Sequence, residues 1–114
     1  MITNANITVY HKNLDTITHL ETWERKNYVV WAFINEKANI NEGFQPNNNG
    51  EIRIPYDEND INVEDFAKGD FVIVEKLEKD IKSISELKDY KKYVITSFTN
   101  NKFGNNPHLH LGVN

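Results

Sequence analysis

The chain closes with "YVITSFTNNKFGNNPHLHLGV", residues 93–113, and this stretch predicts two strands joined by a polar turn. Its first part is rich in β-branched and aromatic residues, its middle is rich in Asn, and its last part alternates His with Leu. Because a short polar connection separates the two strands, we expect them to pair as an antiparallel hairpin. The end of the chain is therefore predicted to be β structure.

The alternation in the last strand separates two faces. Successive side chains of a strand point to opposite sides, so His108 and His110 share one side while Leu109, Leu111 and Val113 share the other. A domain this small needs the apolar triplet in its core. The two histidines are therefore predicted to face solvent or a neighbouring subunit.

Two histidines one residue apart also raise the question of a metal site. A structural zinc site needs four ligands, and the chain contains no cysteine. A further ligand such as His11, His19 or a carboxylate would be needed, but His11 shares its strand face with Ile7 and Val9, which should look into the core. We therefore predict neither a bound metal nor a cofactor.

Alternation of apolar and polar residues with a period of two continues towards the N-terminus and indicates an all-β fold. Residues 27–34 are apolar on both faces, as in a centrally buried strand, and residues 70–77 give the strongest strand pattern in the chain. With residues 6–12, residues 50–56 and the C-terminal pair, the pattern gives about six strands. The prediction is one domain over residues 1–114, all-β, built as a small antiparallel β barrel or sandwich with long inserted loops.

The connections between these strands are long and polar. Residues 13–26 form either a hairpin extension or a loop pinned by Trp23. The loop over residues 36–50 ends in Asn47, Asn48 and Asn49, whose tolerance of positive φ predicts a turn, and it holds the isolated aromatic Phe44, a candidate contact residue. Residues 57–68 form a second long loop, and a short helix is expected after Ser83 or Ser85.

Composition and motifs exclude several classes of function. The net charge is −4, and basic residues are scattered among acidic ones, so tight nucleic-acid binding is not expected. No nucleophile or phosphate-binding motif occurs, which predicts a protein that is not an enzyme. The chain shows no signal peptide and no apolar run approaching the roughly 18 residues of a membrane span. We expect no membrane partner and assembly in a cytoplasm.

The plentiful aromatic residues leave one alternative open. On a small barrel of the oligonucleotide-binding (OB) type, aromatic side chains could stack nucleotide bases. Trp31 and Phe33 lie in the segment that is apolar on both faces, so we expect most aromatic residues to be in the core. An OB-like nucleic-acid-binding barrel nevertheless remains the second hypothesis.

The order of several short motifs resembles small proteins encoded among the head-assembly genes of phages and prophages. These motifs span nearly the whole chain: "MITNANITVYHK", "WER" followed by "VVWAF", "IRIPY", "KGDFVIVE" and the closing "YVITSFTNNKFGNNPHLHLGV". The resemblance implies a minor capsid or head–tail connector protein of a tailed bacteriophage, similar to head-closure proteins. It also implies a small β barrel with a long loop directed to the central channel.

The resemblance further implies partners and a location. A head-closure-like protein would form a ring of identical subunits in the virion neck, below the portal and its adaptor, and would present a surface to the tail. Trp23, Phe44, Asn47, Asn48, Asn49, His108 and His110 are the candidate interface residues. Exposed loops suit the heterologous contacts of a ring, and an acidic protein suits a channel through which DNA must pass without being held.

Overall fold

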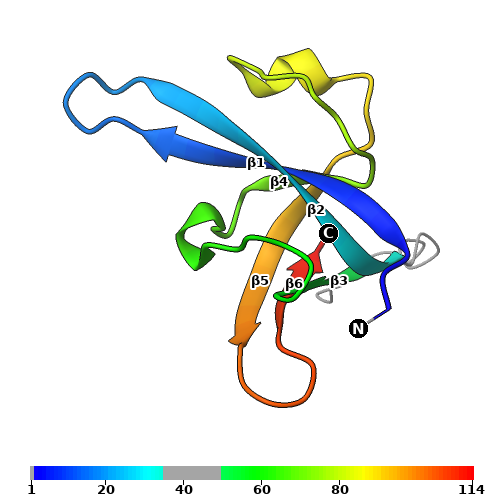
Figure 1. The fold of residues 1–114 in the computed structure, drawn as a ribbon. Coiled ribbons are helices and arrows are strands. Elements are labelled where there is room, and N and C mark those ends of the chain that lie inside the picture. The colour runs from blue at the N-terminus through cyan, green and yellow to red at the C-terminus, as the bar shows by residue number, and fades with distance from the viewer. Residues whose placement is uncertain (1, 35–49) are drawn as a thin grey trace, which may run out of the picture.

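The computed structural model describes residues 2–34 and 50–114, and in these residues the regular structure is almost entirely β (Figure 1). Six strands are formed. Their bounds are β1 Ala5–Leu14, β2 Glu21–Ile34, β3 Gly50–Pro55, β4 Phe71–Ile73, β5 Tyr93–Asn101 and β6 His108–Val113. Two short 3-10 helices, η2 (Val63–Asp65) and η3 (Ile84–Leu87), lie in the long connections on either side of β4.

The six strands close into a small barrel in the order β1-β2-β3-β6-β5-β4, and each neighbouring pair is antiparallel. Closure comes from β1, which pairs with β2 along its whole length and with β4 at Thr8 to Tyr10. The all-β fold class is confirmed, and of the two architectures expected the barrel is the one formed. The hairpin predicted for the end of the chain is β5 paired with β6.

The barrel interior is filled by alternate residues of each strand. Leu109, Leu111 and Val113 are completely buried, as the alternation in the last strand predicts. Gly50 begins β3 where the barrel is tight, since a Cβ there would lie 2.9 Å from the carbonyl oxygen of Phe33. The buried residues of the barrel core are Ile7, Val9, Tyr28, Val30, Ile52, Ile54, Phe66, Val72, Tyr93, Ile95, Leu109, Leu111 and Val113.

The strand predicted for residues 70–77 is wrong in length. Only Phe71–Ile73 is a strand, and the chain then leaves the barrel and crosses beside β1 and β2 before it returns as β5 (Figure 1). We call residues 74–92 the strap. It contains η3, whose N-cap is Ser83, the first of the two serines expected there. The Glu86 carboxylate accepts hydrogen bonds from the backbone N–H groups of Lys82 and Ser83.

The strap covers a second hydrophobic cluster on the outside of the barrel. Tyr10 and Ile73 point outward from β1 and β4 and are buried against Ile81 and Leu87 of the strap. Burying such a side chain stabilises a fold by roughly 1.5–3 kcal/mol. The middle of β1, from Ile7 to Tyr10, is therefore buried on both faces, inside by the barrel and outside by the strap.

The outer face of β2 differs from the prediction of a strand buried on both sides. Val29 is 39% exposed and Phe33 is 55% exposed, while Trp31 between them is partly buried. These three side chains share the outer face because they alternate along the strand. No element in the described residues covers them as the strap covers β1.

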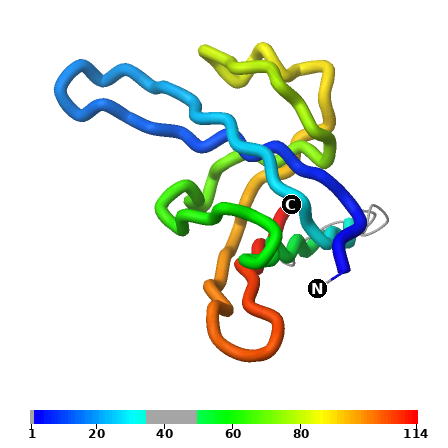
Figure 2. The backbone as a smooth tube through the Cα atoms, in the orientation of Figure 1, coloured from blue at the N-terminus to red at the C-terminus, as the bar shows by residue number. Residues whose placement is uncertain are grey.

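Strands β1 and β2 continue past the barrel as a projecting hairpin (Figures 1 and 2). Their pairing runs without a break from Ala5 with Val30 to Leu14 with Glu21. Of the two alternatives for residues 13–26, the hairpin extension is the one formed. Phe44, Asn47, Asn48 and Asn49, together with the predicted loop over residues 36–50 apart from Gly50, lie outside the described residues.

Truncation of Leu111 tests the packing of the barrel. Because Leu111 is completely buried and its truncation removes apolar packing from the core, Leu111→Ala should lower the free energy of unfolding by about 2–5 kcal/mol. Urea denaturation of the variant and the wild type measures the difference. A loss below about 0.5 kcal/mol, the size usual for surface sites, would contradict this core.

Candidate functional site

The two histidines of β6 lie on the outer face, as predicted, and are partly buried. His108 Nδ1 is 2.8 Å from the carbonyl oxygen of Asn106. His110 Nε2 is 3.4 Å from a carboxylate oxygen of Glu51 but makes no hydrogen bond to a described residue. In residues 2–34 and 50–114, no group of three or more His, Asp or Glu side chains is arranged to hold a metal ion.

His110 belongs to a row of side chains that crosses the outer face of three strands. Trp31 pairs with Arg53 of β3, and Arg53 pairs with His110 of β6. The Arg53 guanidinium lies 4.9 Å from the centre of the Trp31 ring, a cation–π contact. Arg53 was not among the residues predicted from the sequence. It lies between the buried Ile52 and Ile54 in a strand with period-two alternation, which places it on the outer face.

Trp23, a candidate interface residue, instead packs at the base of the hairpin. Its ring centre lies 5.7 Å from that of Phe71, and the side chain borders the second hydrophobic cluster. Trp23 thus joins β2 to β4 beyond the last barrel pair of β1. Its position indicates that it stiffens the base of the hairpin.

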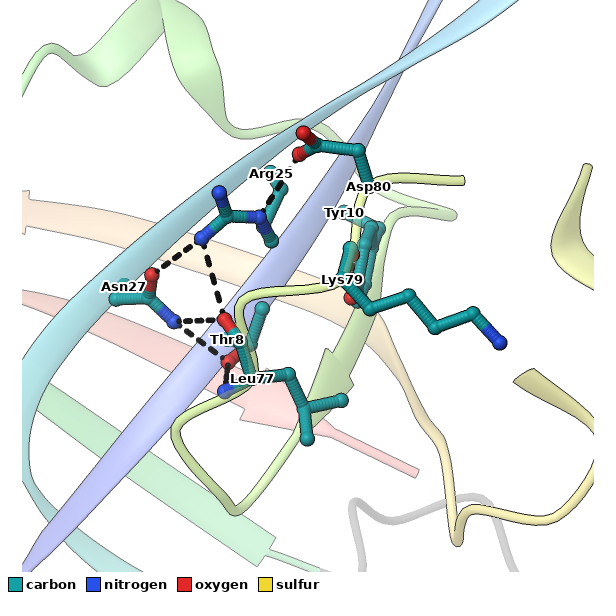
Figure 3. Close-up of polar contacts among 7 residues, drawn as sticks. All are labelled: Thr8, Tyr10, Arg25, Asn27, Leu77, Lys79 and Asp80. Carbon is teal, nitrogen blue, oxygen red and sulfur yellow. Dashed lines mark hydrogen bonds and ion pairs between the residues drawn. The ribbon is translucent and has the colours of Figure 1, made fainter. Parts of the chain in front are cut away.

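The Thr8 hydroxyl holds the strap against the barrel (Figure 3). It donates a 2.7 Å hydrogen bond to the carbonyl oxygen of Glu75 and accepts one of 2.9 Å from the backbone N–H of Leu77. It also accepts a 2.8 Å bond from the Asn27 amide. Thr8 is completely buried, so each of these polar groups depends on a protein partner.

Arg25 and Asn27 of β2 extend this network along the strap (Figure 3). Arg25 donates to Asp80 over 2.9 Å, to the Asn27 side-chain oxygen over 2.8 Å and to the carbonyl oxygen of Leu77 over 3.2 Å. The Tyr10 hydroxyl donates a 2.7 Å bond to the carbonyl oxygen of Lys79. These groups are joined to one another and to the backbone, which is the arrangement of a structural clasp.

A histidine–carboxylate pair lies beside the turn that precedes β4. His11 Nδ1 is 2.6 Å from an oxygen of the buried Asp70 carboxylate. Asp70 also accepts a 2.9 Å bond from the backbone N–H of Ala67 and a 3.3 Å bond from that of Lys12. His11 was predicted to lie on the inner face of its strand, and the group that it contacts is the Asp70 carboxylate. The carboxylate thus ties the turn to β1 through three contacts. The backbone carbonyl oxygen of Asp70 separately accepts a 2.9 Å hydrogen bond from the backbone N–H of Ile95 in β5.

The tip of the projecting hairpin, residues 14–20, has a defined conformation. One oxygen of the Asp15 carboxylate accepts hydrogen bonds from the backbone N–H groups of Ile17 (2.8 Å) and Thr18 (3.3 Å). These bonds hold the pKa of Asp15 below its ordinary value, so the carboxylate is ionised at neutral pH. The backbone of Asp15 bonds to Leu20 and His19, and His19 closes the turn at φ 61°.

This ordered tip carries exposed aliphatic side chains. Leu14, Ile17 and Leu20 are 56%, 87% and 64% exposed. Single exposed apolar residues are normal on a protein surface, but a group of them marks a contact site. The turn between β5 and β6 forms a second projection (Figure 1). Phe103 in this turn is an exposed aromatic residue.

A hollow of about 290 Å³ lies beside Val29 and is lined mainly by polar side chains. Asn59 spans one side of it and bonds to both backbone groups of Val29. Tyr28 also lines the hollow; its hydroxyl is buried with no hydrogen-bond partner among residues 2–34 and 50–114, and burial raises the pKa of this phenol. Lys76 and the carboxylates of Glu58 and Asp60 complete the charged part of the lining.

The described residues thus divide into polar networks that hold the fold and apolar groups that face outward. Thr8, Arg25, Asn27 and Asp70 contact backbone and one another. The exposed apolar groups stand at the hairpin tip and on the outer face of β2. This arrangement suits binding to another macromolecule.

Removal of the Thr8 hydroxyl should loosen the strap. Thr8→Val keeps the shape of the side chain but leaves buried backbone and amide groups without their partner, which should lower the free energy of unfolding by about 1–3 kcal/mol. Thr99→Val, on the exposed end of β5, is the matched control and should change it by less than about 0.5 kcal/mol. Equal values in urea denaturation would refute the clasp.

The tip should respond to acid. The pKa of Asp15 is lower in the folded protein, so its contribution is present above its ordinary value of 3.8 and is lost as pH falls through the folded value. In an NMR titration, the Ile17 and Thr18 amide signals should therefore shift with a midpoint below 3.8. Asp15→Asn should abolish this step, and a midpoint at or above 3.8 would contradict the turn.

Comparison with known proteins places the chain in a family. The profile of a family of unknown function, DUF6751, matches residues 2–114. No curated protein and no solved structure matches the chain. Since the match covers almost the whole sequence, including every strand of the barrel, the chain belongs to the family DUF6751.

Proposed function

We propose that this protein is a virion structural protein of a tailed bacteriophage or prophage, a head–tail connector subunit that docks below the portal and its adaptor and joins the tail. The observation that carries the proposal is the projecting hairpin. It extends from a closed barrel and ends in an ordered tip with the exposed side chains of Leu14, Ile17 and Leu20. The connector role itself comes from the resemblance in sequence.

The geometry supports an assembly protein in two ways. The barrel buries its own core, so the exposed groups are not needed for folding. The tip and the β5–β6 turn project in different directions (Figures 1 and 2), so one subunit can contact two neighbours. Such separated contact points are what a heterologous ring requires.

The charge of the chain supports the same proposal. A connector must let DNA pass through its channel, and phosphate contacts would retard it. The net charge of −4 disfavours such contacts.

In residues 2–34 and 50–114, no helix has the length and apolar character needed to span a membrane.

An OB-like nucleic-acid-binding barrel has less support. The OB fold is a five-stranded, partly open barrel, whereas this barrel has six strands in a closed antiparallel order. Trp31, an aromatic that could stack a base, is already engaged by Arg53. Single-stranded DNA in a gel-shift assay at low salt separates the two functions, because submicromolar binding would favour the OB-like alternative over the connector.

Deletion of the gene in the phage or prophage that encodes this chain tests the connector role. Induction should then give heads and free tails that do not join, because the subunit between them is missing. Negative-stain electron microscopy and plaque counts measure the defect, and the wild-type gene supplied in trans should restore joined particles. Infectious, tailed particles formed without the protein would overturn the proposal.

A further inference from the structure

Two apolar surfaces of this chain lie at opposite ends of one strand. The first is the tip, with Leu14, Ile17 and Leu20. The second is the outer face of β2 at Val29, Trp31 and Phe33, which we call the outer patch. Strand β2 runs from Glu21 to Ile34 and joins them.

The two surfaces cannot meet within one molecule. Twelve residue steps separate Glu21 from Phe33, and at about 3.3 Å per residue a straight strand of this length would span up to about 40 Å. The longest dimension of the molecule is 43 Å. Figures 1 and 2 agree that the tip stands far from the barrel end of β2.

We infer that the tip of one copy of this chain docks on the outer patch of the next copy. The contact is heterologous, since a different surface is used on each copy, and repetition of it gives a closed ring or an open filament. The inference deepens the proposed connector function by naming a second copy as the partner, and it rests on that function for its biological setting.

The chemistry of the two surfaces is complementary. The tip offers aliphatic side chains, and the outer patch offers the exposed side chains of Phe33 and Val29, one on either side of Trp31 along β2. Among residues 14–20, Asp15 carries the single acidic side chain. The patch carries the Arg53 guanidinium over the Trp31 ring, which gives this carboxylate a cation to approach.

The size of the contact explains why a second copy, held in a ring, is the fitting occupant. Three aliphatic side chains and two or three patch residues bury a few hundred Å², below the roughly 1,200 Å² of a stable interface. One such contact is therefore weak. In a ring every subunit makes it twice, and subunits placed side by side on a template gain from their high effective concentration.

Engineered cysteines test the contact directly, because the natural chain has none. Ile17→Cys and Phe33→Cys are made on separate chains that carry tags of different mass, mixed at high concentration and treated with a short bismaleimide. We expect the mixed Ile17–Phe33 product several-fold above either homodimer product. A chain with both substitutions should give a ladder of oligomers, because its own two thiols are too far apart to join.

Phe103→Cys is the matched control, since Phe103 is 92% exposed on a different projection. Mixed with Ile17→Cys, it should give only the small yield of random collision, and circular dichroism should show all variants folded. Adding Leu14→Ser and Leu20→Ser to the Ile17→Cys chain should reduce the mixed product to that yield. The inference is overturned if the Phe33 and Phe103 partners react equally or if homodimers dominate.

The outcome separates this inference from the proposed function. Cross-linking between tip and patch in the purified protein, with normal tail joining after gene deletion, would leave the contact standing and remove the connector role. Defective tail joining without selective cross-linking would leave the connector role standing and remove the contact.

Discussion

Closure of the barrel depends on a strand of three residues. Strand β4 pairs with β1 at Thr8 to Tyr10 and with β5 at Tyr93 and Val94, and this seam turns a curved sheet into a barrel. So short a ladder has few hydrogen bonds of its own. The seam is supported from outside, where the Thr8 hydroxyl holds Glu75 and Leu77 directly after β4 and the second hydrophobic cluster covers Ile73.

The same seam determines where the hairpin leaves the barrel. Because β4 ends its pairing at Tyr10, β1 beyond that residue has β2 as its neighbour in the sheet. Two strands alone are marginally stable in water. Here the base is held by Trp23 against Phe71 and by the bonds of Asp70 to His11 and Lys12, while the tip is ordered by the Asp15 turn. The hairpin is thus supported at both ends, and its apolar tip is kept away from the core.

The sequence predicts the parts of this fold that follow from local alternation. Leu109 and Leu111 lie in the core and His108 and His110 lie outside because period two assigns faces without knowledge of the partner strands. The alternation does not predict where β4 ends. The strand pattern covers residues 70–77, but the strand stops at Ile73, and the chain is then held by the hydroxyl of Thr8, which is 67 residues away from Glu75 in the sequence. The pattern also assigns Phe33 to the core, since an apolar strand face has the same sequence pattern whether or not the fold covers it. Leu14, Ile17 and Leu20 were not identified from the sequence because they are spaced along a polar segment, and only the closed hairpin places them at its projecting end.

We propose that the barrel folds around its own core and that the hairpin tip binds another copy of the chain. The most direct measurement is a methyl NMR spectrum of isoleucine-labelled protein recorded from low to high concentration. The Ile17 methyl signal should shift or broaden progressively, while those of the buried Ile52 and Ile95 stay constant. An Ile17 signal unchanged at the highest concentration, or core signals that move with it, would contradict the account.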